Sequence, residues 1–176
     1  DLLDASRIRL HAQANDKAEV IDLLVGLQAN GGAISDREAY RKAILAREAQ
    51  SSTAIEAGVA VPHAKSDCVK KPSLAAVTLT QGVDYGAMDQ KNSDLFFMIA
   101  APMDGDLHLE ILSRLMVLLM DPAFTKGLRD AGSPQEFLSV IDRAETAKYG
   151  AASPADNPPQ KGAYRIVAVT ACPTGI

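Results

Sequence analysis

Apolar side chains recur along this chain with two different periods, and the alternation of the two predicts an α/β fold. Strand-like segments are residues 8–13, which alternate apolar and polar side chains, residues 73–80, and residues 94–101. Because residues 94–101 are apolar on both faces, we expect a central strand covered by helices on each side. The pattern therefore predicts a single α/β domain in which a mixed, mostly parallel β-sheet is covered by helices on both faces.

Helix-like segments, with apolar residues three or four positions apart, follow recognisable capping residues. The expected helix starts lie at Asp16, Ser35, Asp104 to Asp106, Asp121 and Ser133. The first helix should end at Gly31 and Gly32, and the second between residues 49 and 51.

The composition changes after residue 146. Residues 1–146 form the predicted domain, and residues 147–162, rich in Ala, Ser, Gly and Pro, are typical of a linker. Residues 163–176 form one predicted strand that runs into a turn at Cys172. A single strand cannot form its own core, so we expect this tail to be disordered, docked on a neighbour, or added to an exposed sheet edge. The missing initiator Met and the abrupt end predict a fragment.

Charge and cysteine content narrow the range of partners. The chain has 18 Lys and Arg residues against 22 Asp and Glu residues, a net charge of −4, so it offers no overall positive field for nucleic acid or anionic lipid. Two cysteines far apart, Cys68 and Cys172, do not make a disulfide framework and favour a reducing cytoplasm. The longest apolar runs are shorter than the ~20 residues of a spanning helix, and no export signal is visible. We therefore expect protein or small-molecule partners and no direct insertion into a membrane.

Residues 55–67 place one histidine, His63, at the end of a predicted strand. Gly58 predicts a turn and residues 59–61 a short strand, and Pro62 then removes a backbone donor and fixes φ. No triad pattern and no second ligand for a metal lies nearby. His63 could thus act alone as an acid, base or nucleophile, or be an ordinary surface or core residue.

Two further residues are candidates for chemistry. Arg47, together with Glu48, closes the second helix, where the two could form an ordinary surface pair. His108 lies in the first turn of the helix at residue 107, where the helix dipole disfavours an imidazolium ion and favours a nearby anion. Taken alone, such a histidine is more often a surface residue at a helix start.

Residues 51–65, with the sequence SSTAIEAGVAVPHAK, resemble the active-site segment of the fructose-type enzyme IIA domain of the bacterial sugar phosphotransferase system. The motif Pro-His-Ala-Lys at residues 62–65 is more similar to the fructose branch of the family than to the mannitol or nitrogen-regulatory branches. The resemblance implies that His63 accepts a phosphoryl group and that Arg47, sixteen positions earlier, belongs to the same site. It also implies that His108, which opens a Leu-His-Leu-Glu-Ile-Leu helix, is a neutral hydrogen-bond partner of His63 or of its phosphoryl group. The tail resembles the start of an enzyme IIB domain, whose phosphorylated cysteine would be Cys172.

The resemblance implies a phosphoryl relay. The phosphocarrier HPr would phosphorylate His63, and the group would then pass to the cysteine of enzyme IIB and to an incoming sugar, fructose. Enzymes IIB and IIC would be partners, and the domain would work in the cytoplasm at the inner face of the membrane when joined to the permease. No metal, nucleotide or other cofactor is implied. The alternative is a regulatory module that signals its phosphorylation state to a protein partner. A hydrolase built on His63 is not expected, because the sequence shows neither an activated nucleophile nor a metal site.

Overall fold

The computed structural model of the chain describes residues 2–150 and residue 166, and within these residues the core is one five-stranded sheet. The strand order is β1 (Ile8–Ala12), β4 (Ser73–Val83), β5 (Ser93–Ala101) and β2 (Val59–Ala60), and β3 (His63–Lys65) also pairs with β5. β4 and β5 are antiparallel, whereas β1 pairs parallel with β4, and β2 and β3 pair parallel with β5. The predicted mixed, mostly parallel sheet is therefore confirmed.

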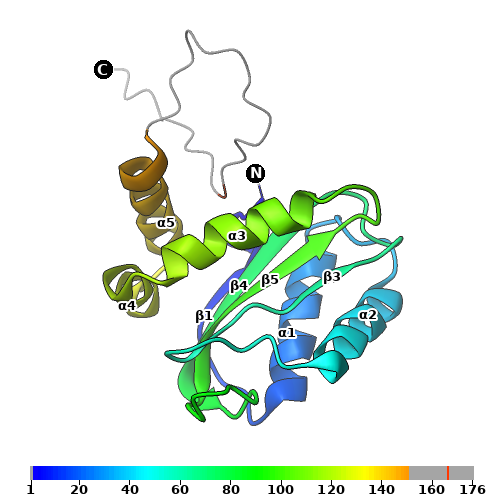
Figure 1. Cartoon of the computed structure of the whole chain (residues 1–176), viewed down its shortest axis with the longest axis horizontal. Helices are drawn as coiled ribbons and strands as arrows, with labels where there is room; N and C mark the ends of the chain where they lie inside the picture. The colour runs from blue at the N-terminus through cyan, green and yellow to red at the C-terminus, as the bar shows by residue number, and fades with distance from the viewer. Residues whose placement is uncertain (1, 151–165, 167–176) are drawn as a thin grey trace, which may run out of the picture.

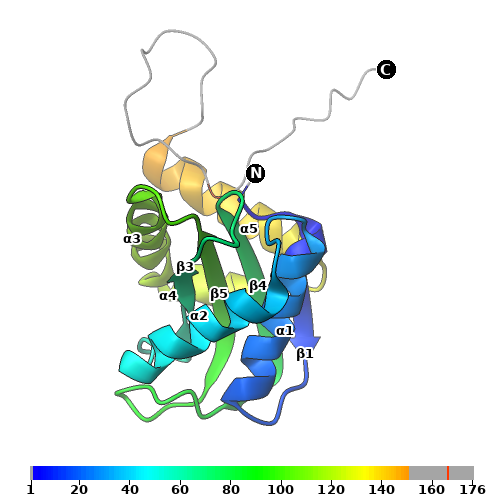
Figure 2. The same ribbon diagram turned by 90° about the vertical axis from the view of Figure 1, so that its right-hand side faces the viewer.

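Helices cover both faces of the sheet. α1 (Lys17–Asn30) and α2 (Arg37–Gln50) pack on one face, and α3 (Leu107–Leu119), α4 (Pro122–Asp130) and α5 (Pro134–Tyr149) pack on the other (Figure 1, Figure 2). β5 explains why both layers form. Its residues 95, 97 and 99 belong to the core under α3 and α5, and its residues 96, 98 and 100 belong to the core under α1 and α2. The central position predicted for this strand is confirmed, because β5 has partners on both sides.

The predicted caps of α1, α4 and α5 are confirmed, and those of α2 and α3 differ. The cap of α2 is Asp36, which accepts from the backbone N–H of Ala39 at 3.0 Å, and not Ser35. The Ser35 hydroxyl instead donates to the Cys68 carbonyl at 3.1 Å, so this side chain is used to join two loops. Asp106 is at the N-cap of α3, but its side chain makes no capping hydrogen bond.

Two elements run further than their sequence signals. β4 continues to Val83, past the expected end at residue 80, and α5 continues to Tyr149, so it overlaps the first residues of the segment expected to be a linker. The rest of that segment and the tail, including Cys172 but not Ile166, lie outside the described residues.

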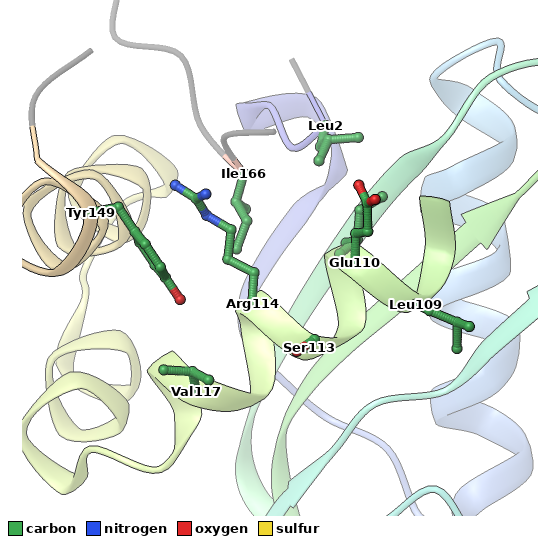
Figure 3. A pocket seen from close by; sticks show the side chains of 9 residues that line it. Leu2, Leu109, Glu110, Ser113, Arg114, Val117, Tyr149 and Ile166 are labelled. Carbon is green, nitrogen blue, oxygen red and sulfur yellow. The ribbon is translucent and has the colours of Figure 1, made fainter. Parts of the chain in front are cut away.

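Ile166 is one of the residues that line a groove between α3, α5 and the start of the chain (Figure 3). Its N–H donates to Glu145 Oε2 at 3.1 Å, its carbonyl accepts from the N–H of Leu3 at 3.3 Å, and its side chain is buried. Glu145 also accepts from Arg114 Nε at 2.9 Å, and the Arg114 guanidinium stacks on the Tyr149 ring. This residue of the C-terminal segment is therefore held by the domain through backbone, charge and apolar contacts.

Candidate functional site

A short hairpin, residues 53–61, leads the chain to His63. The N–H of Ile55 donates to the carbonyl of Val59 at 2.8 Å, and the N–H of Val61 donates to the carbonyl of Thr53 at 3.1 Å. These bonds place Val61 and the following Pro62 beside β5.

The tip of this hairpin requires glycine. Ala57 and Gly58 both have positive φ values, 63° and 79°, and a Cβ at Gly58 would lie 3.0 Å from Arg129 Nη2 and 3.1 Å from Asp94 Oδ1. Arg129 donates to the Ala57 carbonyl at 2.6 Å and pairs with Asp94 at 2.9 Å. Arg129 of α4 thus ties the tip of the hairpin to β5.

His63 opens β3 after a break in the sheet at Val61 and Pro62. The Pro62 carbonyl accepts from the N–H of Ile99 at 2.9 Å, so the chain rejoins the sheet, which was not expected from the sequence. His63 is in register with Ile99, whose side chain belongs to the core under α3. Paired residues of parallel strands face the same side, and His63, half-buried, therefore lies on the α3 side of the sheet.

One hydrogen bond sets the protonation pattern of the His63 ring. Nδ1 lies 2.8 Å from the carbonyl oxygen of Val61. A carbonyl can only accept, so Nδ1 carries the hydrogen and donates it. In the neutral ring, Nε2 is then left with an unshared electron pair, which is the state that a nucleophile needs.

His108 lies in the first turn of α3, which begins close to the carboxyl end of β5. Burial lowers the pKa of His108 from its ordinary value of 6.5, and the positive charges of Lys65 and of protonated His63 lower it further, whereas Asp106 acts in the opposite direction. These interactions mean that His63 and His108 are electrostatic neighbours. His108 Nδ1 is buried and has no hydrogen-bond partner within the described part of the chain. His108 is thus a neutral ring with a polar atom available to a ligand or to its neighbour.

Lys65 is a residue of the site that the sequence interpretation missed. It is two positions after His63 on β3, so it lies on the same side of the strand, and its Nζ donates to the Gly105 carbonyl at 2.9 Å in the loop before α3. The sequence carries no periodic signal for it, because a strand of three residues is too short for one to be visible. Lys65 brings a positive charge to the two histidines.

Arg47 lies in the last turn of α2, a helix that packs against β3. Its Nη1 donates to the Ser51 carbonyl at 3.0 Å, and the residue is half-exposed. The structure thus brings together His63, His108 and Lys65, and it places Arg47 on the neighbouring helix with its guanidinium on the C-terminal end of α2. The inclusion of Arg47 in the site stays a prediction.

Residues 1–144 match the family model described as "Phosphoenolpyruvate-dependent sugar phosphotransferase system, EIIA 2". The "PTS system fructose-specific EIIABC component" of Bacillus subtilis (strain 168) is 42% identical over 180 residues, which cover 100% of this chain and 28% of that protein. The "PTS system fructose-specific EIIA component" of Haloferax volcanii is 37% identical over 135 residues, 76% of this chain and 88% of that protein. This chain therefore corresponds to most of a single-domain relative and to less than a third of the Bacillus relative.

Solved structures with the same fold include two informative neighbours. The nitrogen regulatory protein IIA-Ntr from Neisseria meningitidis has a TM-score of 0.75 at 25% identity, with 79% of this chain and 95% of that chain covered. Enzyme IIAMTL from Escherichia coli, solved in a complex with phosphorylated enzyme IIBMTL, has a TM-score of 0.71 at 26% identity, with 80% of this chain and 97% of that chain covered. The fold described above is thus shared by an enzyme IIA solved with an enzyme IIB and by a nitrogen regulatory protein.

Proposed function

The chain belongs to the EIIA 2 family of the phosphoenolpyruvate-dependent sugar phosphotransferase system, and from that premise we propose that His63 is the residue that carries its phosphoryl group. Members of this family are phosphotransferases that pass phosphate along the system. The observation that carries the proposal is the 2.8 Å hydrogen bond from His63 Nδ1 to the Val61 carbonyl, because it leaves Nε2 unprotonated on a half-buried residue at the start of β3.

In the first transfer, the electron pair of Nε2 attacks the phosphorus atom of a phosphohistidine donor, HPr or an HPr-like domain. A new P–N bond forms, the donor's P–N bond breaks, and its electron pair returns to the donor nitrogen. No proton has to leave His63, because its hydrogen is on Nδ1, and the Val61 carbonyl stabilises the positive charge that the phosphorylated ring acquires.

The other residues of the site contribute charge and position. The loose transition state of phosphoryl transfer spreads negative charge over the equatorial oxygens, so the protein's task is in-line positioning and electrostatic stabilisation. Lys65 supplies a positive charge beside His63, and the neutral His108 offers a hydrogen bond to a phosphoryl oxygen. Arg47, after leaving Ser51, would hold two phosphoryl oxygens in a planar grip.

In the second transfer, a cysteine thiolate of an enzyme IIB domain attacks phosphorus, an S–P bond forms, and the P–N bond returns its electrons to Nε2. The Escherichia coli neighbour, solved in a complex with a phosphorylated enzyme IIB, supports an enzyme IIB domain as the partner in this step. The fructose-specific names of the Bacillus and Haloferax relatives support fructose as the sugar. Cys172 is the proposed cysteine of the segment that follows the domain, and residues 147–162 are the proposed linker.

The proposed domain works at the inner face of a membrane beside its IIC permease. No helix in the described part of the chain is both long and apolar enough to span a membrane. A regulatory role is the second candidate, since the fold is shared with IIA-Ntr. The match of the entire chain to an EIIABC transporter, beyond residue 144, favours transport.

Phosphorylation with phosphoenolpyruvate, enzyme I and HPr, followed by intact mass measurement, tests the proposal. The wild-type chain should gain one phosphate, and His63→Ala should gain none. The chain has three histidines, and His11, whose Nε2 is 3.0 Å from the Ala131 carbonyl, provides the matched control: His11→Ala should still gain one phosphate. His108→Ala should also accept phosphate on His63, about 10²- to 10³-fold more slowly, because one preorganised partner of the transition state is lost. Phosphate retained by His63→Ala would overturn the assignment.

A further inference from the structure

Glu48 is a buried carboxylate next to the site and not the surface residue that the sequence suggested. It lies near the end of α2 with 8% of its surface exposed, and its side chain points into the protein. A charged group is buried at this level only when it is paired and hydrogen-bonded, so its partners indicate its role.

Both carboxylate oxygens of Glu48 are engaged. Oε2 pairs with Lys17 Nζ at 2.8 Å and accepts from the N–H of Thr53 at 3.2 Å. Oε1 accepts from the Thr53 hydroxyl and, at 3.2 Å, from the Tyr85 hydroxyl. Burial raises the pKa of Tyr85, and the negative charge of Glu48 raises it further, so Tyr85 stays a donor. Glu48 thus holds both the side-chain hydroxyl and the backbone N–H of Thr53.

From Thr53 a continuous series of hydrogen bonds leads to His63. The Thr53 carbonyl accepts from the N–H of Val61 at 3.1 Å, and the Val61 carbonyl accepts from His63 Nδ1 at 2.8 Å. The N–H of Val61 is bonded to Thr53, and the carbonyl of Val61, in the next peptide group, is bonded to the His63 ring. The position of the Val61 backbone therefore depends on a residue that Glu48 holds in place.

We propose that Glu48 is a positioning residue for the phosphoryl transfer, acting through Thr53 and Val61 to keep the hydrogen of the His63 ring on Nδ1. This inference rests on the proposed role of His63 as the phosphoryl acceptor. Glu48 does not touch the phosphoryl group. Its effect is to select the tautomer and the ring orientation, as a residue behind a metal-binding or catalytic histidine commonly does.

Replacing Glu48 by Gln keeps the size of the side chain and removes the charge. The amide has only one oxygen to accept with, so it cannot serve Lys17, Thr53 and Tyr85 at the same time. The hairpin should then hold Val61 less firmly, and some His63 rings should carry the hydrogen on Nε2, the nitrogen that must attack. We expect phosphorylation by phospho-HPr to slow about 10- to 100-fold.

The decisive measurement is the ¹⁵N chemical shifts of the His63 ring at neutral pH, which report the tautomer directly. In the wild-type protein Nδ1 should be protonated, and in Glu48→Gln a measurable fraction should be protonated on Nε2. Glu145→Gln is the matched control. Glu145 is as deeply buried and is also hydrogen-bonded, but its contacts are to Arg114 and Ile166 on the opposite face of the sheet. Its replacement should destabilise the fold and leave the His63 tautomer unchanged.

Thr53→Val is the second variant, for use if Glu48→Gln does not fold. It removes the hydroxyl bond to Glu48 and keeps the N–H and carbonyl of residue 53, so it should shift the tautomer in the same direction by a smaller amount. A folded Glu48→Gln or Thr53→Val protein with the wild-type tautomer and the wild-type transfer rate would overturn the proposal. The tautomer is read on unphosphorylated protein, so its outcome does not depend on whether the wild-type chain accepts phosphate. Failure of the wild-type chain to accept phosphate would instead contradict the proposed function.

Discussion

His108 shows how the surroundings of one residue set its chemistry. Burial is the largest influence that lowers its pKa below 6.5, and the charges of Lys65 and His63 add to it. At neutral pH the ring is uncharged, so it has one N–H with which to donate to a phosphoryl oxygen and adds no second positive charge beside Lys65. Its location at the start of α3 acts in the same direction.

The pKa of His108 should respond to both neighbouring charges. We expect Lys65→Met to raise it, because a repelling positive charge is removed, and phosphorylation of His63 to raise it, because negative charge is added. Titration of the ring by NMR measures both shifts, with Lys91→Met as a control for charge far from the site. An unchanged pKa in Lys65→Met would show that Lys65 does not act on His108.

The same shift has a defined effect on stability. Because the folded-state pKa lies below the unfolded value of 6.5, the unfolded chain binds more protons in the interval between the two. Above pH 6.5 His108 is neutral in both states and does not make the free energy of unfolding depend on pH. As the pH falls through that interval, the unfolded chain takes up protons first, so the free energy of unfolding decreases. His108→Gln should remove this part of the pH dependence, which urea unfolding at pH 7 and pH 5.5 would measure.

Arg47 gives a test of geometry as opposed to charge. Arg47→Lys keeps the positive charge but loses the planar two-point grip on the phosphoryl oxygens, so we expect transfer to slow about 10-fold or more with the fold intact. Arg41→Lys is the control, because Arg41 is on the same helix and pairs with Asp22. Transfer at the wild-type rate through Arg47→Lys would contradict the role proposed for Arg47.

At the scale of elements, the hairpin that delivers His63 depends on a strained tip. Gly58 and Gly32 both have positive φ, 79° and 73°, but only Gly58 is crowded by Arg129, Asp94 and the backbone of Asn92. Gly32→Ala should cost about 1 kcal/mol from the left-handed backbone alone. Gly58→Ala should cost more and should also slow phosphorylation, because its neighbours at 3.0 to 3.2 Å must move. Urea unfolding of the two variants, compared with each other, separates backbone strain from crowding, and equal losses would contradict this reasoning.

The elements that the sequence predicted well are long ones. The helices contain several turns, so the apolar period specifies both their type and the faces they bury, and β5 is recognisable as a long run that is apolar on both faces. β2 was expected at residues 59–61 from the turn at Gly58 and from Pro62, whereas β3, with three residues, is too short for any period to be visible and is a strand through its pairing with β5. Tertiary contacts also decided the α2 cap, where Asp36 and Ser35 are adjacent and both able to cap.

The candidate site could be predicted from the sequence only where a segment resembles a known family. His63 and His108 were singled out through that resemblance, and their roles stay predictions, whereas the contacts of Lys65 and Glu48 form between elements. Glu48 in particular has the sequence context of an exposed helix end. Its burial follows from the loop containing Thr53 and the side chain of Tyr85, which are brought to it only when the sheet forms.

At the scale of the whole molecule, the sheet connects two helical layers with different tasks. The layer of α1 and α2 holds Glu48 and Arg47, and the layer of α3 to α5 holds His108 and binds Ile166 (Figure 1, Figure 3). β3 lies between the two layers, so His63 can be positioned from one side and assisted from the other. Ile166 belongs to the core cluster that includes residues of α3, the helix whose first turn carries His108.

Ile166 should contribute to the stability of the domain, although it lies beyond the 144 residues that match the family model. Its side chain is 1% exposed, and Ile166→Ala should lower the free energy of unfolding by about 2 kcal/mol, because buried methyl groups are lost and only part of the space can close. Leu109→Ala is the control, because Leu109 lines the same groove but is 53% exposed, so its loss should cost within about 0.5 kcal/mol.

Both variants should accept phosphate on His63 at the wild-type rate, since neither residue touches the histidine. Urea unfolding and the phosphorylation assay measure the two quantities separately. Equal stability of Ile166→Ala and the wild-type chain would show that this residue does not anchor the C-terminal segment to the domain in solution.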